Sequence, residues 1–142
     1  MSPLWLVPVD GSLHALRAVD HVVREAGGDA LAPAIILVNV QAPLPSDVTR
    51  FIDGSVVQDY HREAGEAALA SARVRLAAAG LACSEHILIG ETAQTIVDFA
   101  REQHCTLIIM AARGLGSVAG VLLGSVTHRV VHLTDLPVLV VK

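Results

Sequence analysis

Residues 4–12 read Leu-Trp-Leu-Val-Pro-Val-Asp-Gly-Ser, an apolar run that ends in an acidic turn. The run from Leu4 to Val9 has the length of a buried strand, and Asp10-Gly11-Ser12 has the composition of a turn. Apolar residues spaced three and four apart predict a helix from His14 to Ala26, which ends at two glycines. Because Ile35–Val40 is again an uncharged apolar run, the chain opens with a strand, a helix and a second strand.

The same alternation continues to the end of the chain. We expect further strands and helices over these ranges: strands Cys83–Ile89, Thr106–Ala111 and Pro137–Val141, and helices Val56–Ala79, Thr92–Gln103 and Ser125–Leu133. Residues Gln41–Gly54, with two prolines, predict a long loop that either covers a site or only connects its neighbours. Apolar strands without polar alternation are buried on both faces, which favours a parallel sheet with helices on each side. Right-handed crossovers then predict an α/β fold with an open, doubly wound, five-stranded parallel sheet.

Composition limits the class of protein. The chain has 142 residues and a mass of 14.9 kDa, so we expect one domain over residues 1–142. Hydrophobic residues make up 53% and the mean hydropathy is +0.57, which excludes a disordered chain. The longest apolar run, Cys105–Ala112, falls well short of the ~18 residues that a membrane helix needs, and the N-terminus lacks the basic segment of a signal peptide. We therefore expect a cytoplasmic protein that has no membrane partner.

The charge and the cysteine count exclude further classes. The net charge is −4, the isoelectric point is about 5.9, and the chain has one lysine, Lys142, and four aromatic residues. A basic track with stacking rings for nucleic acid is therefore not expected. Cys83 and Cys105 are too few for a disulfide framework or for a zinc site of their own, and we expect both to be buried in strands.

Two turns carry the residues from which a binding site could be built. In doubly wound sheets, ligands bind beyond the carboxyl ends of strands, where the winding reverses. One such turn is Asp10-Gly11-Ser12, and the other is Ala111–Gly116, in which Arg113 offers a cation while Gly114 and Gly116 permit close approach of backbone. Ser125 is a suitable N-cap for the helix that follows, whose first N–H groups attract phosphate. The arrangement suits a nucleotide, although turn glycines and a capping serine are also common without any ligand.

Several other motifs are incomplete. The segment Gly114–Gly120 fits a dinucleotide fingerprint only loosely, because Asp135 precedes the last strand instead of ending a strand about 20 residues on. The sequence contains no GxxxxGK[ST] and no GxSxG. His128 and His132 have a metal-compatible spacing, but no HExxH glutamate and no evident third ligand accompany them. We interpret these histidines as surface or partly packed residues and expect no metal site.

One combination of motifs resembles a known family. Ala111-Ala112-Arg113-Gly114, nine further residues and then Gly124-Ser125 are similar to the motif of nucleotide-binding universal stress proteins. The resemblance extends over the chain, from Val7–Ser12 through Leu37–Val40 and Ile89-Gly90 to Leu136–Val141. One departure is Ala111, which stands where that motif has its first glycine. A positive φ at this position would cost alanine ~1–3 kcal/mol, whereas a negative φ would tolerate the methyl group.

The resemblance implies a strand order of 3-2-1-4-5, which places both turns at the switch point. It also implies an adenine nucleotide such as ATP, ADP or AMP, with or without Mg²⁺, in a protein that regulates a stress response. Residues near the base and ribose would be Pro8, Val9, Asp10, Val40 and Met110. Residues near the phosphates would be Ala111, Arg113, Gly114, Gly124, Ser125, Val126 and Thr127.

The resemblance leaves three functional classes open: a nucleotide-binding regulator, a dimeric interaction module without nucleotide, and a slow ATPase. No general base is evident at the phosphate end, so we name no catalytic residue. The segment Gly114–Leu123 distinguishes the first two classes, because it either leaves room for a ligand or collapses into the pocket. The apolar last strand predicts a bare sheet edge, and the resemblance implies a homodimer through this strand.

Overall fold

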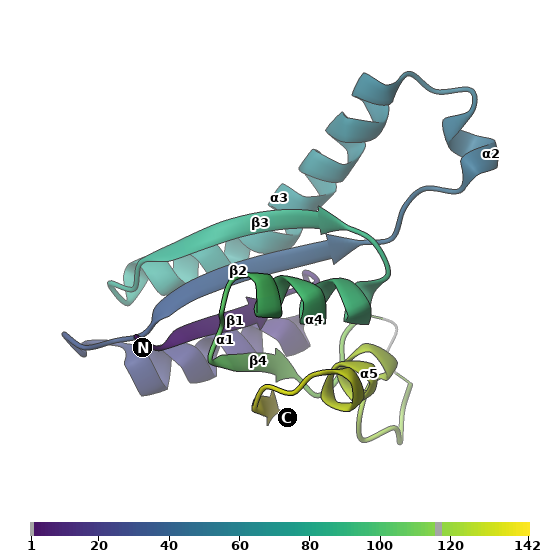
Figure 1. Cartoon of the computed structure of the whole chain (residues 1–142). Helices are drawn as coiled ribbons and strands as arrows, with labels where there is room; N and C mark the ends of the chain where they lie inside the picture. Colours follow the sequence, from purple (N-terminus) through teal and green to yellow (C-terminus); the bar gives the residue numbers. More distant parts are fainter. Residues whose placement is uncertain (1, 116–117) are drawn as a thin grey trace.

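The five strands form one parallel sheet with helices on both faces, as Figure 1 shows for a computed structural model that describes residues 2–115 and 118–142. The strands are β1 (Leu4–Pro8), β2 (Ala34–Gln41), β3 (Cys83–Ile89), β4 (Leu107–Ala111) and β5 (Val138–Val141). Their order is β3-β2-β1-β4-β5 and every neighbouring pair is parallel, which confirms the expected α/β doubly wound fold. Since β2 and β4 lie on opposite sides of β1, the winding reverses at β1, which brings the two predicted turns to one edge.

The four expected helices are present, and each of their bounds lies within two residues of the prediction. They are α1 (Leu13–Ala26), α3 (Gly54–Ala78), α4 (Thr92–Glu102) and α5 (Ser125–Leu133). One helix was not predicted from the sequence. It is α2 (Ser46–Thr49), a single turn inside the predicted loop. Asp53 is exposed and is the N-cap of α3, and its Oδ1 accepts the Ser55 N–H at 3.0 Å. This hydrogen bond lowers the pKa of the Asp53 carboxyl.

The sheet has two apolar cores, one on each face. Alternate strand residues divide between them: Val7 lies in the core under α1 and α3, and Leu6 lies in the core under α4 and α5. The central strands β1, β2 and β4 are largely buried, as their apolar composition predicts. The edge strand β3 is an exception, since Ser84 and Glu85 are exposed. The burial of both faces expected for every strand is therefore wrong for β3, and also for the other edge strand, β5, where no residue is fully buried, because the helices cover the edges of the sheet less completely.

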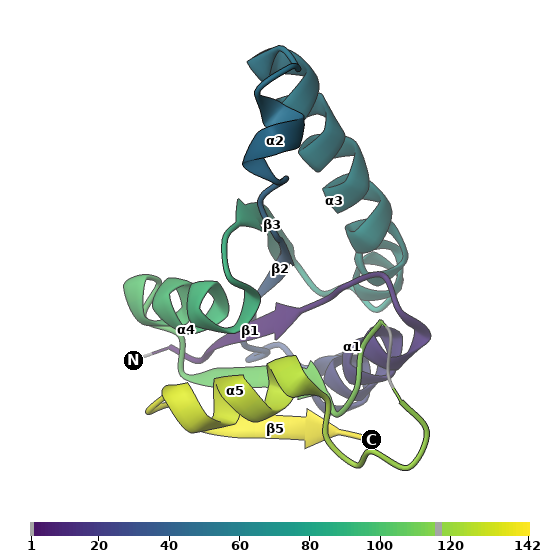
Figure 2. The ribbon, with the colours of Figure 1, turned by 90° about the vertical axis from the view of Figure 1, so that its right-hand side faces the viewer.

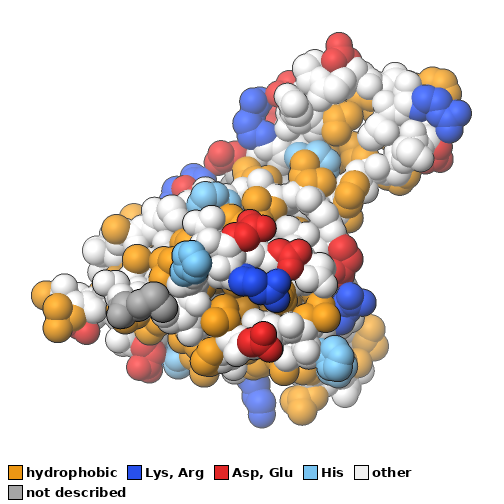
Figure 3. Space-filling model, in the orientation of Figure 1, with side chains coloured by type: hydrophobic (Ala, Val, Ile, Leu, Met, Phe, Trp, Pro, Cys, Tyr) orange, Lys and Arg blue, Asp and Glu red, His pale blue; other side chains and the backbone are white. Residues whose placement is uncertain are grey.

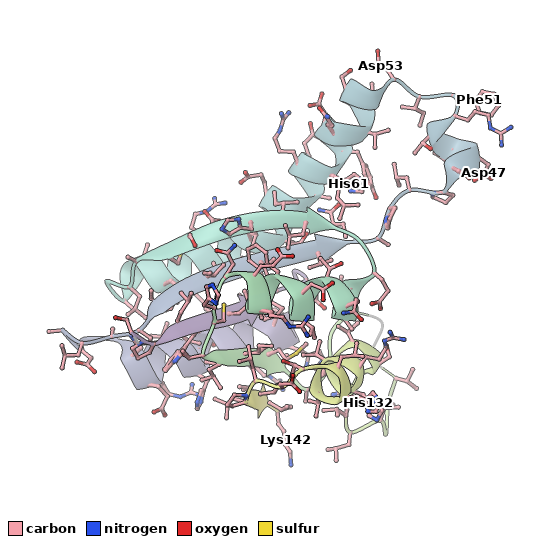
Figure 4. The ribbon with its side chains drawn as sticks, viewed as in Figure 1. Asp47, Phe51, Asp53, His61, His132 and Lys142 are labelled. Carbon is pink, nitrogen blue, oxygen red and sulfur yellow. The ribbon has the colours of Figure 1, made fainter. Side chains whose placement is uncertain are left out.

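Residues 42–60 form an arm that projects away from the sheet, as Figure 2 shows for α2 and the first turns of α3. Phe51 lies at the outer end of this arm in Figure 4 and its side chain is 82% exposed. Further down α3, Gly65 packs against β3, since a Cβ there would lie 2.5 Å from Ile87 Cδ1. A residue with a side chain would collide here, because the Ile87 side chain fills the space that a Cβ would need.

Both cysteines are free thiols. Cys105 is buried as expected, but Cys83 is only half-buried because it lies on the edge strand β3. Burial raises the pKa of both thiols; at Cys83 the Glu85 carboxylate adds to this effect and the Arg73 guanidinium opposes it. The face seen in Figure 3 carries acidic and basic side chains next to one another. Within the described ranges, no helix is long and apolar enough to span a membrane.

Candidate functional site

A cavity of about 680 Å³ opens at the carboxyl edge of the sheet, where the β1 and β4 turns meet. All but one of the twelve residues predicted for the site line this cavity: Pro8, Val9, Asp10, Val40, Met110, Ala111, Arg113, Gly114, Gly124, Ser125 and Val126. The twelfth, Thr127, is buried, and its hydroxyl donates a hydrogen bond of 2.8 Å to the Ala111 carbonyl oxygen. The Thr127 side chain therefore joins α5 to β4 instead of facing the cavity.

Asp10 connects the two turns through its carboxylate. Its Oδ1 accepts the Ser12 N–H at 2.9 Å, and its Oδ2 accepts the Leu115 N–H at 2.9 Å. The first bond closes the turn after β1, and the second spans 105 positions in the sequence. A carboxylate oxygen has two lone pairs, so each oxygen of Asp10 can still accept one hydroxyl donor from a ligand.

Gly114 serves this connection by its lack of a side chain. A Cβ at residue 114 would collide with Asp10 Oδ2. From the sequence we expected Gly114 and Gly116 to let backbone approach a ligand. At Gly114 the structure shows instead a close approach to the Asp10 carboxylate, and Gly116 lies outside the described residues.

Ala111, the departure from the family motif, adopts an ordinary strand conformation. It is the last residue of β4, and within the described ranges His104 is the only non-glycine residue with a positive φ. The strain considered for an alanine in the left-handed region is therefore absent. Ala111 lines the cavity, and its methyl group adds no backbone cost.

The first turn of α5 presents open N–H groups to the cavity. Gly124 is the N-cap, and no side chain among the described residues accepts a capping hydrogen bond at this end. Ser125, predicted as the N-cap, is instead the first helical residue, because Gly124 has the extended backbone (φ −66°, ψ 158°) that a cap position requires. The Gly124 N–H donates to the Ala112 carbonyl oxygen at 2.7 Å, which fixes the helix start against the β4 turn. Uncapped N–H groups at a helix N-terminus favour an anion.

Three basic side chains line the cavity: Arg113, His128 and Arg129. Of these, only Arg113 was predicted from the sequence. Ser125, His128 and Arg129 are spaced three and four apart, so they share one face of α5, and this spacing could have identified the other two. Arg129 also pairs with Glu91, the N-cap of α4, at 3.7 Å from Nε to Oε1.

Apolar residues from other elements complete the lining. They are Ala15 of α1, Val38 of β2, Ile96 of α4, and Leu115, Val118, Val121 and Leu123 of the segment before α5; Thr92 of α4 also takes part. No residue of 41–54 contributes, so the predicted loop is an arm and does not cover the site. The described part of Gly114–Leu123 borders the cavity and leaves it open.

Metal-ligating side chains do not gather at this site. In the part of the chain that the structure describes, no three His, Cys, Asp or Glu side chains are placed to hold one metal ion. His128 faces the cavity, whereas His132, labelled in Figure 4, does not contribute to its lining.

The sequence model of the universal stress protein family matches residues 5–142. The chain belongs to the universal stress protein family. Universal stress protein MJ0531 of Methanocaldococcus jannaschii is 32% identical over 140 residues, which are 96% of this chain and 80% of that protein. Universal stress protein YxiE of Bacillus subtilis is 30% identical over 145 residues, with 96% and 97% of the two chains covered.

Solved structures of the family share the fold. The structure of MJ0577, from M. jannaschii, matches with a TM-score of 0.84 and 28% identity, over 100% of this chain and 96% of that one. A universal stress protein solved with cAMP matches with a TM-score of 0.74 and 28% identity, over 99% and 97% of the two chains. An Archaeoglobus fulgidus member solved with dAMP has a TM-score of 0.68 at 24% identity, over 100% of this chain and 98% of that one, and shows the fold alone.

Proposed function

We propose that this universal stress protein is a stress-response regulator that binds an adenine nucleotide, such as ATP, ADP or AMP, at the rim between β1 and β4. The observation that carries the proposal is the open cavity, which has the Asp10 carboxylate at one turn and the uncapped N-terminus of α5 at the other. A carboxylate accepts hydrogen bonds from ribose hydroxyls, and a free helix N-terminus attracts phosphate.

The residues present fit such a ligand. Apolar side chains from three strands, including Val38, Val40 and Met110, offer a surface against which a purine ring can pack. Gly114, Gly124 and Ser125 offer small surfaces and backbone at the opposite, phosphate end. The universal stress protein solved with cAMP supports the choice of an adenine nucleotide.

A charge placed at the first residue of α5 tests the proposal. Titration calorimetry of the wild type with AMP, ADP and ATP is expected to show binding. In Ser125→Asp the new carboxylate favours the helix N-terminus but repels phosphate, so affinity is expected to fall about tenfold or more. Ser55→Asp is the matched control, because it adds the same charge to the first turn of α3, far from the cavity, and should leave binding unchanged.

Nucleotide that accompanies the protein through purification gives a second test. Mass spectrometry of the denatured purified protein reports any nucleotide carried from the cell. If none is released, and if no heat accompanies any of the three nucleotides in the wild type, this chain is not a nucleotide-binding member of its family.

We further propose a homodimer through β5. Within the described residues this strand pairs only with β4, so its outer edge is open to a second chain. Leu139 is 37% exposed at this edge. An apolar open edge supports strand pairing between two copies about a two-fold axis.

A further inference from the structure

Besides the open N–H groups of the first turn of α5, the cavity is lined by two guanidinium groups and an imidazole. Arg113 enters from the turn after β4, and His128 and Arg129 enter from the second turn of α5. His128 and Arg129 lie about one turn along α5 from Ser125 and share a face of the helix with it, and Arg113 belongs to the turn that contacts the start of this helix. An anion seated at Ser125 would therefore have side-chain N–H donors available from the β4 turn and from further along α5.

The cavity contains little negative charge to balance these groups. Asp10 is the only carboxylate among the described lining residues, and each of its oxygens already accepts a backbone N–H. Glu91 lies at the rim outside the lining and pairs with Arg129. Both members of this pair are more than half exposed, at 57% for Arg129 and 55% for Glu91, so water screens their attraction and either can change partner at little cost.

We propose that His128 and Arg129 read the length of the phosphate chain and make the cavity selective for adenosine di- and triphosphates over the monophosphate. The proposal rests on the proposed function. The first phosphate lies at the N-terminus of α5, and the later phosphates contact Arg129 and the ring N–H of His128. A guanidinium and an imidazole N–H are both suitable donors to phosphate oxygens.

Glu91 acts against this selectivity. When a phosphate chain reaches Arg129, it must displace the Glu91 carboxylate, which then remains close to a second anion. Glu91→Gln removes this repulsion and keeps a side-chain oxygen for the N–H of Gln94, which the carboxylate accepts at 2.7 Å. This variant therefore separates the charge of Glu91 from its role as the cap of α4.

The experiment measures dissociation constants for AMP, ADP and ATP by titration calorimetry in the wild type and in four variants. We expect ATP to bind the wild type about tenfold more tightly than AMP, the difference that one charge-assisted hydrogen bond contributes. Arg129→Gln and His128→Ala are expected to remove most of that ratio while AMP affinity changes by less than about twofold. Glu91→Gln should increase the ratio. Arg101→Gln is the matched control, since it removes one exposed charge from α4 outside the cavity lining.

The outcomes separate the two proposals. If AMP binds the wild type as tightly as ATP, or if Arg129→Gln and His128→Ala weaken all three nucleotides equally, the phosphate-length inference is wrong while nucleotide binding stands. If no nucleotide binds any of the five proteins, both proposals fail together. Thermal unfolding of each variant without nucleotide checks that the substitutions, all at exposed positions, leave the fold intact.

Discussion

The contact between Asp10 and Gly114 shows how one residue without a side chain holds two distant turns together. The Asp10 carboxylate reaches the Leu115 N–H only because residue 114 has no Cβ in its way. Ala111, three residues earlier, has no comparable constraint, since it has an ordinary strand backbone that accommodates a methyl group. The two small residues of the motif therefore have different physical requirements.

We expect Gly114→Ala to displace Asp10 and to break its bond to Leu115. Loss of one such hydrogen bond corresponds to a fall of about threefold to tenfold in ADP affinity. Ala111→Gly is the matched control and should change affinity by less than about threefold, because no strain is relieved. Titration calorimetry gives the affinities, and hydrogen exchange of the Leu115 amide, measured by NMR, reports the bond directly. Equal affinities for Gly114→Ala and the wild type would show that this connection does not organise the site.

Among the secondary-structure elements, a polar network joins the base of the arm to the end of β1. The buried His61 of α3 places its Nδ1 2.7 Å from Gln41 Oε1, and Gln41 Nε2 donates to Asn39 Oδ1 at 3.0 Å. Asn39 Nδ2 in turn donates to the Val9 carbonyl oxygen at 2.9 Å, one residue before Asp10. The ring N–H of His61 is thus on Nδ1, because Gln41 Oε1 can only accept. The network fixes α3 to the sheet where the helix leaves it.

His61→Ala should lower the free energy of unfolding by about 1–3 kcal/mol, because the buried imidazole is lost and the half-buried Gln41 Oε1 loses its donor. Gln58→Ala, at an exposed position one turn earlier in α3, should change it by less than about 0.5 kcal/mol. Urea unfolding followed by circular dichroism measures both. If the two variants lose the same stability, the network does not hold the base of the arm.

The complete sheet has two different edges. At the β3 edge, Glu85 pairs with Arg73 of α3, with 2.7 Å between Nε and Oε1, and charged side chains discourage pairing with another strand. β5 has no charged residue between Val138 and Val141, and Lys142 follows at its end in Figure 4. The carbonyl oxygens of Pro137 and Val141 accept N–H groups from Ile108 and Ala112, so the alternation along the strand directs the backbone groups of Val140 outward.

Val140→Pro should therefore convert the proposed dimer to a monomer while the bonds between β4 and β5 remain. Proline removes the outward N–H of an edge strand and leaves the inward ones. Multi-angle light scattering at high micromolar concentration measures the mass. Val74→Ser, at an exposed position of α3, which packs against β2 and β3 at the other side of the sheet, is the control and should remain dimeric. A wild type that is already monomeric at this concentration would contradict the dimer.

The fold and most of the site's position follow from the order of residues along the chain. Apolar runs separated by turn residues specify parallel strands, and the carboxyl ends of such strands must share one edge of the sheet. Alternating strands and helices with right-handed crossovers predict an open doubly wound sheet, but they do not by themselves fix the order of its strands. The resemblance to the family motif added the strand order 3-2-1-4-5, which placed the turn at Asp10 and the turn after the fourth strand at one switch point.

The direction in which individual side chains face depended on how the elements pack. Thr127 turns inward to Ala111, whereas His128 and Arg129 face the cavity, because packing on α4 and the Thr127 bond to β4 set the rotation of α5. The sequence also did not show that the Asp10 carboxylate requires a glycine at position 114. These two residues are far apart in the chain, so the distance between them depends on the packing of the whole sheet. The spacing of apolar residues predicts which face of a helix or strand is buried. Which residues contact that face depends on the packing of all the elements.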